Sequence, residues 1–231
     1  MAGEQSQDKT EQPTGKKLAD ARQKGNVAQS REIPSVLILS GSLGVLFFAG
    51  SWMLGRLTEV MRTIYQRAGT LSMLPETMHT LFWDIFLNGI VVLVPLMLAV
   101  MTAAVLGNVA QFGFLITGEK LSPNLAKLNP ISGLSRIISV RSLIELIKNL
   151  LKLAIIGLVG WSVIQSRMPA TLRLYDHAPA YIIFFIFKVA FQIVLSITLV
   201  MALLSFFDFF YQKWKFKEDQ KMTKQEVKDE H

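Results

Sequence analysis

The sequence predicts an all-α integral membrane protein: four long hydrophobic helices, arranged as two helical hairpins that a long cytoplasmic loop joins. Of the 231 residues, 51% are hydrophobic, and a mean hydropathy of +0.39 accompanies a formal net charge of +7. Apolar blocks must therefore alternate with basic ones, as in membrane proteins. Four blocks are long enough to cross a hydrocarbon core, which takes about 20 helical residues. They are residues 36–54, 81–109, 146–164 and 182–207.

The chain begins with about thirty polar residues, whereas a signal peptide has a short basic start and an apolar run of about 7 to 15 residues. We therefore expect the first span to be kept as an anchor. Thr14 is placed to cap a short helix that runs through Lys24 and stops at Gly25. Ser30 is placed to cap the next helix, with Pro34 in its first turn. The alternative is a solvated basic tail.

The first hairpin, residues 33–112, contains spans 1 and 2, and the second, residues 146–207, contains spans 3 and 4. Pro95 lies within span 2 and should kink it. Basic residues gather before span 1, between spans 2 and 3, and after span 4, whereas the two outer loops hold fewer. Because Lys and Arg accumulate on the cytoplasmic side, both termini and the middle loop should face the cytoplasm.

The middle loop, residues 113–145, keeps an apolar residue every three or four positions although prolines interrupt it. Two interpretations remain open: an amphipathic segment on the membrane surface, or a belt that packs along a partner. The candidate partner-binding residues are Leu121, Pro123, Leu125, Leu128, Pro130, Ile131, Leu134, Arg136 and Ile138.

Six ionisable residues lie inside the spans or at their edges: Asp84, Glu145, Lys148, Lys152, Lys188 and Asp208. An unpaired charge in lipid is costly, so each should face protein or water. On span 3, three of them share one helical face. Depth along the spans suggests two pairings, Asp84 with Lys188, and Asp208 with Lys148 or Lys152. The alternative for the residues at span ends is a side chain that reaches the interface without a partner.

Several kinds of site are not expected in this chain. It has no Cys, and its three His are far apart, so we expect no metal, no cofactor and no catalytic site. Acidic residues interrupt the N-terminal basic run, and that run has no aromatic residue, which disfavours nucleic-acid binding.

Three strings carry a family resemblance: "KTEQPTGKKLADARQKGNVAQSRE", "GEKLSPNLAKLNPISGLSRIISVRSLIELIKNLLK" and "KMTKQEVKDEH". Each resembles the corresponding segment of the type III secretion export-gate switch proteins, a family with flagellar and injectisome branches. The match follows the whole chain in order. Gly15 departs from it, because the family often has Pro at this position.

The resemblance implies an inner-membrane subunit whose two hairpins wrap around a gate made of other small membrane subunits. It also implies that the loop at Gly118 to Ser142 encircles the gate entrance, and that the six charged residues face other subunits. Residues 208–231 resemble the linker helix that leads to a soluble self-cleaving domain. Because Asn-Pro-Thr-His is absent from this sequence, we expect no enzymatic activity here and take the chain as the N-terminal membrane part.

We therefore predict a subunit of the bacterial flagellar export gate in the inner membrane. Its partners would be the other gate subunits, the export apparatus, exported unfolded proteins and membrane lipid. One alternative is the injectisome counterpart. A more remote alternative is a small four-helix transporter or channel, in which Asp84, Lys152 and Lys188 would line a pathway.

Overall fold

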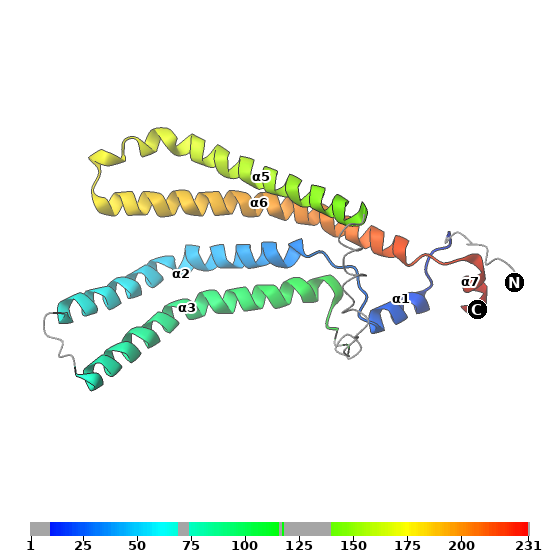
Figure 1. Cartoon of the computed structure of the whole chain (residues 1–231), viewed down its shortest axis with the longest axis horizontal. Coiled ribbons are helices and arrows are strands. Elements are labelled where there is room, and N and C mark those ends of the chain that lie inside the picture. Colours follow the sequence, from blue (N-terminus) through cyan, green and yellow to red (C-terminus); the bar gives the residue numbers. More distant parts are fainter. Residues whose placement is uncertain (1–9, 69–73, 116, 118–139, 231) are drawn as a thin grey trace. The chain divides into compact units, whose positions relative to one another are not determined.

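The computed structural model describes residues 10–68, 74–115, 117 and 140–230, and most of them are helical. The helices are α1 (Gly15–Gln23), α2 (Glu32–Arg67), α3 (Pro75–Phe112), α5 (Val140–Thr171), α6 (Pro179–Asp219) and α7 (Lys224–Glu230) (Figure 1). A short 3-10 helix, η3 (Leu174–Asp176), connects α5 to α6. Within this described part of the chain, extended pairing is limited to one isolated bridge, between Glu11 and Met222. The all-α fold class is confirmed.

The chain divides into two compact units. The first unit consists of Met1–Ile33 and Asn108–His231, and the second unit is Pro34–Gly107. Most of α2 and α3 therefore forms the second unit, while α1, α5, α6 and α7 belong to the first.

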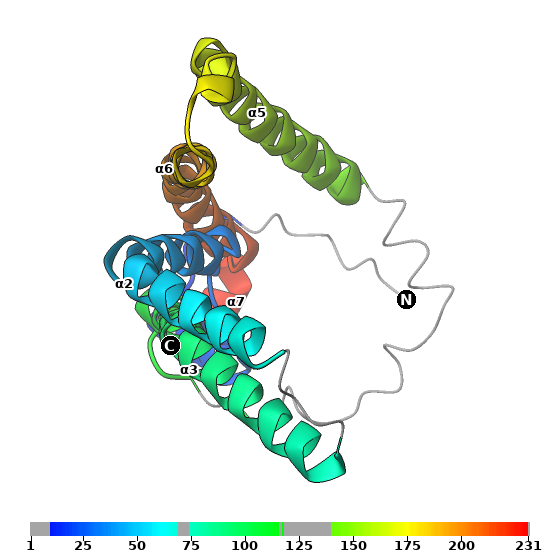
Figure 2. The same cartoon turned by 90° about the vertical axis from the view of Figure 1, so that its left-hand side faces the viewer.

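In the second unit, α2 and α3 run side by side in opposite directions (Figures 1 and 2). Their backbones come close at two glycines. A Cβ added at Gly41 would lie 3.5 Å from the Cβ of Ala103, and one added at Gly107 would lie 2.8 Å from the Cα of Pro34. The second distance is shorter than any ordinary carbon contact, so a side chain does not fit at Gly107. Small residues thus set the spacing of this helix pair, as is common between membrane helices.

In the first unit, α5 and α6 are joined through η3 and contact each other (Figures 1 and 2). A polar contact links α5, just beyond predicted span 3, to α6 within predicted span 4. The Arg167 guanidinium donates from Nε at 3.0 Å and from Nη2 at 2.6 Å to the side-chain oxygen of Gln192. The sequence pattern did not indicate this contact.

Each predicted span lies inside a helix, but three helices, not four, are both long and apolar enough to cross a membrane among the described residues. They are α2, α3 and α6. The predicted third span lies in α5, where Glu145, Lys148 and Lys152 follow one another within about two turns. Its longest uncharged run, residues 153–166, holds 14 residues, fewer than the roughly 20 that a crossing helix needs. The structure therefore supports three of the four predicted spans, and the predicted span in α5 stays a prediction.

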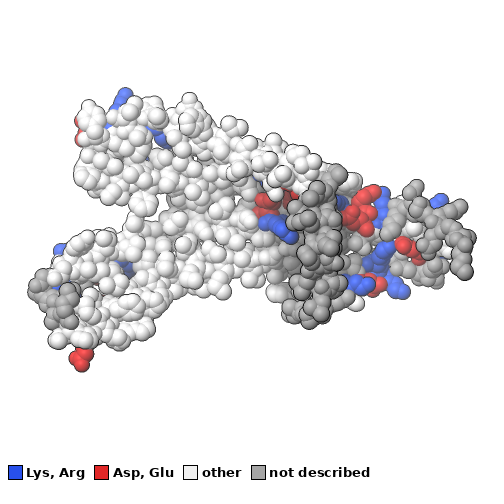
Figure 3. Space-filling view, viewed as in Figure 1, with Lys and Arg blue, Asp and Glu red and all other residues white. Residues whose placement is uncertain are grey.

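Few residues of the three apolar helices are buried. In the most apolar 18-residue stretch of α2, α3 and α6, 11%, 6% and 6% of the residues are buried. Figure 3 shows that the visible surface over α5 and α6 is also uncharged along most of its length. Exposed apolar surface of this extent requires lipid or other protein to cover it. The chain is thus built as a multi-pass membrane protein.

The C-terminal segment differs from the single linker helix predicted for residues 208–231. Helix α6 continues without interruption through position 208 and ends at Asp219. Residues 220–223 then separate it from α7.

Candidate functional site

The segment between α1 and α2, residues 24–31, forms a bend that we call the elbow. Thr14 caps α1 as predicted, because its hydroxyl accepts a hydrogen bond from the Lys17 backbone N–H at 3.2 Å. Gly25 follows α1 with a φ of 72°, a left-handed conformation that glycine adopts without strain. The end of α1 and the start of the elbow are therefore fixed by local sequence.

The elbow and the last turn of α1 bind the C-terminal end of α3. The Arg22 guanidinium donates to the Phe112 carbonyl at 2.9 Å, where the helix leaves carbonyl groups without intrahelical partners. The Gln29 amide donates to Asn108 at 3.1 Å, and the Ser30 backbone N–H donates to the Gln111 side-chain oxygen at 2.8 Å. Three hydrogen bonds thus hold this helix end, one from α1 and two from the elbow.

Ser30 also connects the elbow to α6. It is fully buried, with 0% of its surface exposed. Its hydroxyl donates to the Asp208 carboxylate at 2.5 Å and accepts a hydrogen bond from the Glu32 backbone N–H at 3.3 Å. The predicted capping of α2 is therefore confirmed, and Pro34 lies in the first turn as expected. The contact with Asp208 was not predicted, since 178 residues separate the two side chains.

A charged pocket of about 690 Å³ lies beside this contact. It is lined by Gln29, Arg31, Glu32, Ile144, Glu145, Lys148, Asn149, Lys152, Asp208, Tyr211, Gln212 and Lys215. Four of the six charged residues singled out in the sequence therefore meet in one place. The predicted polar face of α5 is real, and it faces the elbow and α6.

The ion pair in this pocket joins the first residue of α2 to α5. The Lys152 ammonium lies 2.5 Å from the Glu32 carboxylate, and both side chains are about three-quarters shielded, with 23% and 22% exposed. Lys148 instead lies over the aromatic ring of Tyr211, 3.8 Å from its centroid, and Lys215 lies 5.9 Å from the same centroid. These are cation–π contacts.

The prediction that Asp208 pairs with Lys148 or Lys152 is therefore wrong, because both lysines have other partners. Asp208 accepts hydrogen bonds from Ser30 and from the Gln212 amide, the latter at 3.5 Å. Depth along a helix gave no information about the N-terminal segment, which supplies Ser30 to Asp208 and Glu32 to Lys152.

The remaining candidates are placed as follows. Glu145 lines the charged pocket, and Lys188 is exposed on α6. Asp84 accepts a hydrogen bond at 3.1 Å from Asn88, one turn further along α3. The predicted pairing of Asp84 with Lys188 joins two separately described units and stays a prediction. The nine loop residues from Leu121 to Ile138 lie outside the described residues.

A smaller polar pocket of about 220 Å³ lies within the second unit, between the far ends of α2 and α3. Arg56, Glu59, Arg67 and Asp84 are among its lining residues. Arg56 and Glu59 form an ion pair at 3.3 Å, one turn apart on α2. Sequence reasoning identified Asp84 but did not place these charged neighbours around it.

Neither pocket resembles a metal site. Within the described ranges, no group of three or more His, Cys, Asp or Glu side chains is arranged to hold a metal ion. The side chains that line the charged pocket come from four chain segments: the elbow, the start of α2, α5 and α6.

The chain is similar in sequence to a known family of proteins. Residues 7–231 match the sequence model of the FlhB HrpN YscU SpaS Family. The chain is 34% identical to Flagellar biosynthetic protein FlhB of Bacillus subtilis (strain 168), with 97% of this chain and 62% of the relative aligned. It is 29% identical to Yop proteins translocation protein U of Yersinia pestis, over 100% of this chain and 64% of the relative.

A third relative, Flagellar biosynthetic protein FlhB of Aquifex aeolicus (strain VF5), is 29% identical over 96% of this chain and 63% of its own length. The chain thus spans somewhat less than two thirds of the curated relatives that it matches. Together, the match of the family model across almost the whole chain and the 34% identity to one relative show that the chain belongs to the FlhB HrpN YscU SpaS family.

Proposed function

We propose that this chain is the membrane part of a subunit of the bacterial flagellar type III protein export gate. The observation that carries the proposal is its 34% identity, along 97% of its length, to a relative named for flagellar biosynthesis. The multi-pass helical architecture supports it, because an export gate has to be embedded in the inner membrane.

In this proposal both termini face the cytoplasm, and α5 pairs with α6 as a second membrane hairpin. The charges of α5 support such an arrangement. Lys152 is neutralised by Glu32, and Lys148 rests on an aromatic ring. The charged first turns of α5 would then lie at the cytoplasmic surface, shielded by the elbow, while residues 153–166 enter the membrane.

The gate would be held by the two hairpins, and the loop that includes Leu121, Leu128, Leu134 and Ile138 would clasp its entrance. The elbow binds the end of α3, the helix that leads into this loop, and Glu32, the residue that directly follows the elbow, binds α5, the helix that leaves the loop. A shift of the elbow would therefore move both ends of the loop. Opening would be a change in the populations of closed and open assemblies. We propose no catalytic role for these residues.

The decisive experiment is deletion of the gene in the organism that encodes it, followed by measurement of protein release into the medium. We expect export of the flagellar filament protein to stop and to return when the full-length gene is restored. Secretion of a protein with a cleaved signal peptide serves as the control and should be unchanged. Normal filament-protein export after deletion would refute the proposal.

The loop is tested separately by a photo-crosslinking residue at Leu128 in the full-length protein in cells. Adducts with small integral membrane proteins would support the clasp. Adducts with lipid alone would instead support an amphipathic segment on the membrane surface.

A second candidate is the corresponding subunit of an injectisome. It is favoured by the relative named Yop proteins translocation protein U, which aligns over the whole chain at 29% identity. In that case the same deletion would abolish secretion of virulence proteins and leave flagellar filaments intact. The more remote transporter proposal predicts instead that the isolated chain moves an ion or a solute across liposomes and that Lys188→Gln stops it.

A further inference from the structure

The two ends of the first unit are paired through their backbones. The Glu11 N–H donates to the Met222 carbonyl at 3.0 Å, and the Met222 N–H donates back to the Glu11 carbonyl at 3.0 Å. This is the hydrogen-bonded pair of an antiparallel ladder, reduced to one residue on each side. Met222 belongs to the short segment that separates α6 from α7, so the N-terminal segment holds the chain where these helices meet.

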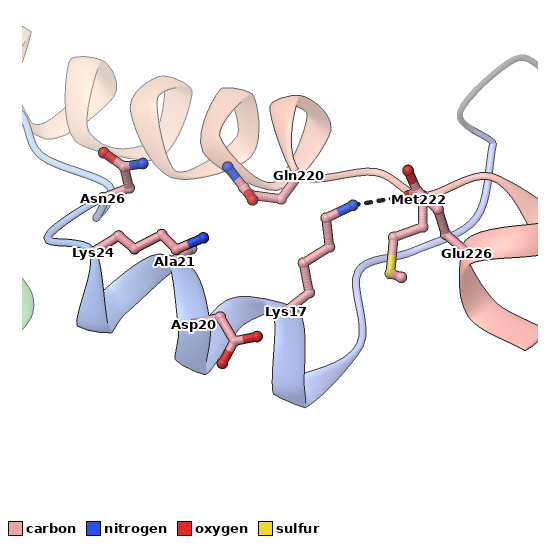
Figure 4. Close-up of a pocket in the computed structure, with 8 residues that line it drawn as sticks. All are labelled: Lys17, Asp20, Ala21, Lys24, Asn26, Gln220, Met222 and Glu226. Atoms are coloured by element: carbon pink, nitrogen blue, oxygen red, sulfur yellow. Dashed lines mark hydrogen bonds and ion pairs between the residues drawn. The ribbon is translucent and has the colours of Figure 1, made fainter. Parts of the chain in front are cut away.

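Side-chain packing reinforces this pairing. Met222 is almost completely buried, with 2% of its surface exposed, and Ala21 on α1 is 7% exposed. Both line an open pocket of about 510 Å³ between α1 and the α6–α7 junction. In Figure 4, Lys17 extends from α1 toward Glu226 on α7, and the two form an ion pair at 3.0 Å.

Glu226 has a second role at the start of α7. Its backbone N–H donates to the Thr223 hydroxyl at 3.2 Å, and its carboxylate accepts from the Thr223 backbone N–H at 3.4 Å. This reciprocal arrangement is a capping box, formed by Thr and Glu three residues apart. The oxygen that caps the helix, Oε2, is also the oxygen that binds Lys17. One carboxylate therefore joins the attachment of α1 to the first turn of α7.

We propose that residues 11–21 form a reversible latch on the α6–α7 junction. In the closed state, shown by the structure, the bridge and the Lys17–Glu226 pair fix the direction in which α7 leaves α6. In the open state, Met222 is exposed to solvent and α7 keeps only its own capping box. The inference goes beyond the proposed export function and does not depend on it.

The small size of the contact is the reason for expecting it to open. It contains a single-residue bridge, one buried methionine, and an ion pair whose side chains are 27% and 44% exposed. Ion pairs so exposed to solvent are weak. The closed state is therefore favoured over the open state by a small margin, which a change of one residue or one bound partner is able to reverse.

The latch is tested by cysteine labelling of the full-length protein in native membranes. The described chain has no Cys, so a single Met222→Cys substitution supplies a unique thiol within it. We expect maleimide to label this thiol much more slowly than the thiol of Gln225→Cys, which lies on the exposed side of α7. Lys17→Gln should accelerate labelling at position 222 about two- to fivefold, the range that follows from an ion pair of this exposure.

One further variant separates the two roles of Glu226, and another serves as a control for the change of charge. Glu226→Gln removes the charge but keeps the capping box, which accepts Gln as well as Glu. It should accelerate labelling as much as Lys17→Gln does, with no further increase in the double variant. Lys16→Gln makes the same charge change on the exposed side of α1, and it should have no effect.

Because Met222→Cys itself alters the latch, Ala21→Cys provides an independent probe on the opposite side of the contact, with Met222 intact. The proposal is overturned if positions 21 and 222 are labelled as fast as position 225 in the otherwise unchanged protein. It is equally overturned if Lys17→Gln and Lys16→Gln have the same effect. None of these readouts involves export, so a failure here is distinguishable from a failure of the proposed function.

Discussion

Different kinds of contact stabilise the interior of each of the two units. In the second unit, α2 and α3 approach at glycines, and the contact at Gly107 leaves no room for a side chain. In the first unit, the elbow reaches α3 and α6 through polar contacts, and the adjacent Glu32 reaches α5. The central side chain, Ser30, is fully buried. The second unit depends on shape and the first on hydrogen-bond and charge partners.

This difference has a consequence for dynamics. Close backbone packing is rigid, because any separation of the helices loses many small contacts at once. Polar contacts are individually replaceable by water or by another polar group, so the first unit is better suited to rearrange. We infer that changes of conformation in this chain begin at the elbow.

The largest effect is expected for Gly107→Val. The new side chain would collide with Pro34, whose Cα lies 2.8 Å from the position of the added Cβ. Overpacking of this kind costs about 3 kcal/mol. Gly89→Val, on the same helix, meets nothing within 4 Å and serves as the matched control. Reversible unfolding in detergent micelles measures both, and equal destabilisation by the two variants would show that α2 and α3 do not pack as described.

Ser30→Ala should destabilise the first unit by about 2 kcal/mol, because it removes a buried hydrogen bond to a carboxylate and leaves the Asp208 charge with fewer donors. Ser51→Ala, at an exposed position of α2, is the control and should have little effect. The same unfolding experiment compares the two variants. A loss below 0.5 kcal/mol for Ser30→Ala, a threshold set by the scatter typical of surface substitutions, would contradict the role of the elbow.

The Lys152–Glu32 pair should show a smaller coupling, about 1 kcal/mol, in a double-mutant cycle of Lys152→Met and Glu32→Gln. Its side chains are about a quarter exposed, whereas those of the Arg56–Glu59 pair in the second unit are 50% and 68% exposed. A parallel cycle on Arg56 and Glu59 should therefore give a coupling near zero. If the two couplings were equal, shielding of the charged pocket would not be what strengthens the first pair.

The smallest effect is expected for Tyr211. Tyr211→Leu removes the ring under Lys148 and should cost about 0.5 to 1 kcal/mol. Tyr211→Phe keeps the ring and should be nearly neutral. Both variants lack the tyrosine hydroxyl, and only Tyr211→Phe keeps the aromatic ring. Equal losses of stability would therefore exclude the cation–π contact as their cause.

Sequence reasoning succeeded where the signal is local. Thr14, Gly25 and Pro34 follow capping and turn rules that involve neighbours in the chain, and the four long helices follow from apolar length. The shared face of Glu145, Lys148 and Lys152 follows from helical spacing. These features need no knowledge of the tertiary fold.

The partners of the charged residues could not be obtained in this way. Ser30 and Glu32 reach Asp208 and Lys152 across 178 and 120 residues, and nothing in an apolar pattern indicates such a contact. The Glu11–Met222 bridge has no sequence signal either, since one residue shows no alternation. The capping box of Thr223 and Glu226 was readable as a motif, and it would have indicated that a new helix begins after α6.

The claim that the elbow organises the first unit is tested most directly by disulfide crosslinking of Ser30→Cys with Asp208→Cys in the full-length protein in native membranes. The side-chain oxygens of these residues are 2.5 Å apart, so the two thiols should crosslink readily. Ser30→Cys with Ser196→Cys is the control, because position 196 lies about 18 Å further along the same helix, at 1.5 Å per residue. Efficient crosslinking of the first pair alone would confirm the claim. Absence of that crosslink, or equal crosslinking of both pairs, would contradict it.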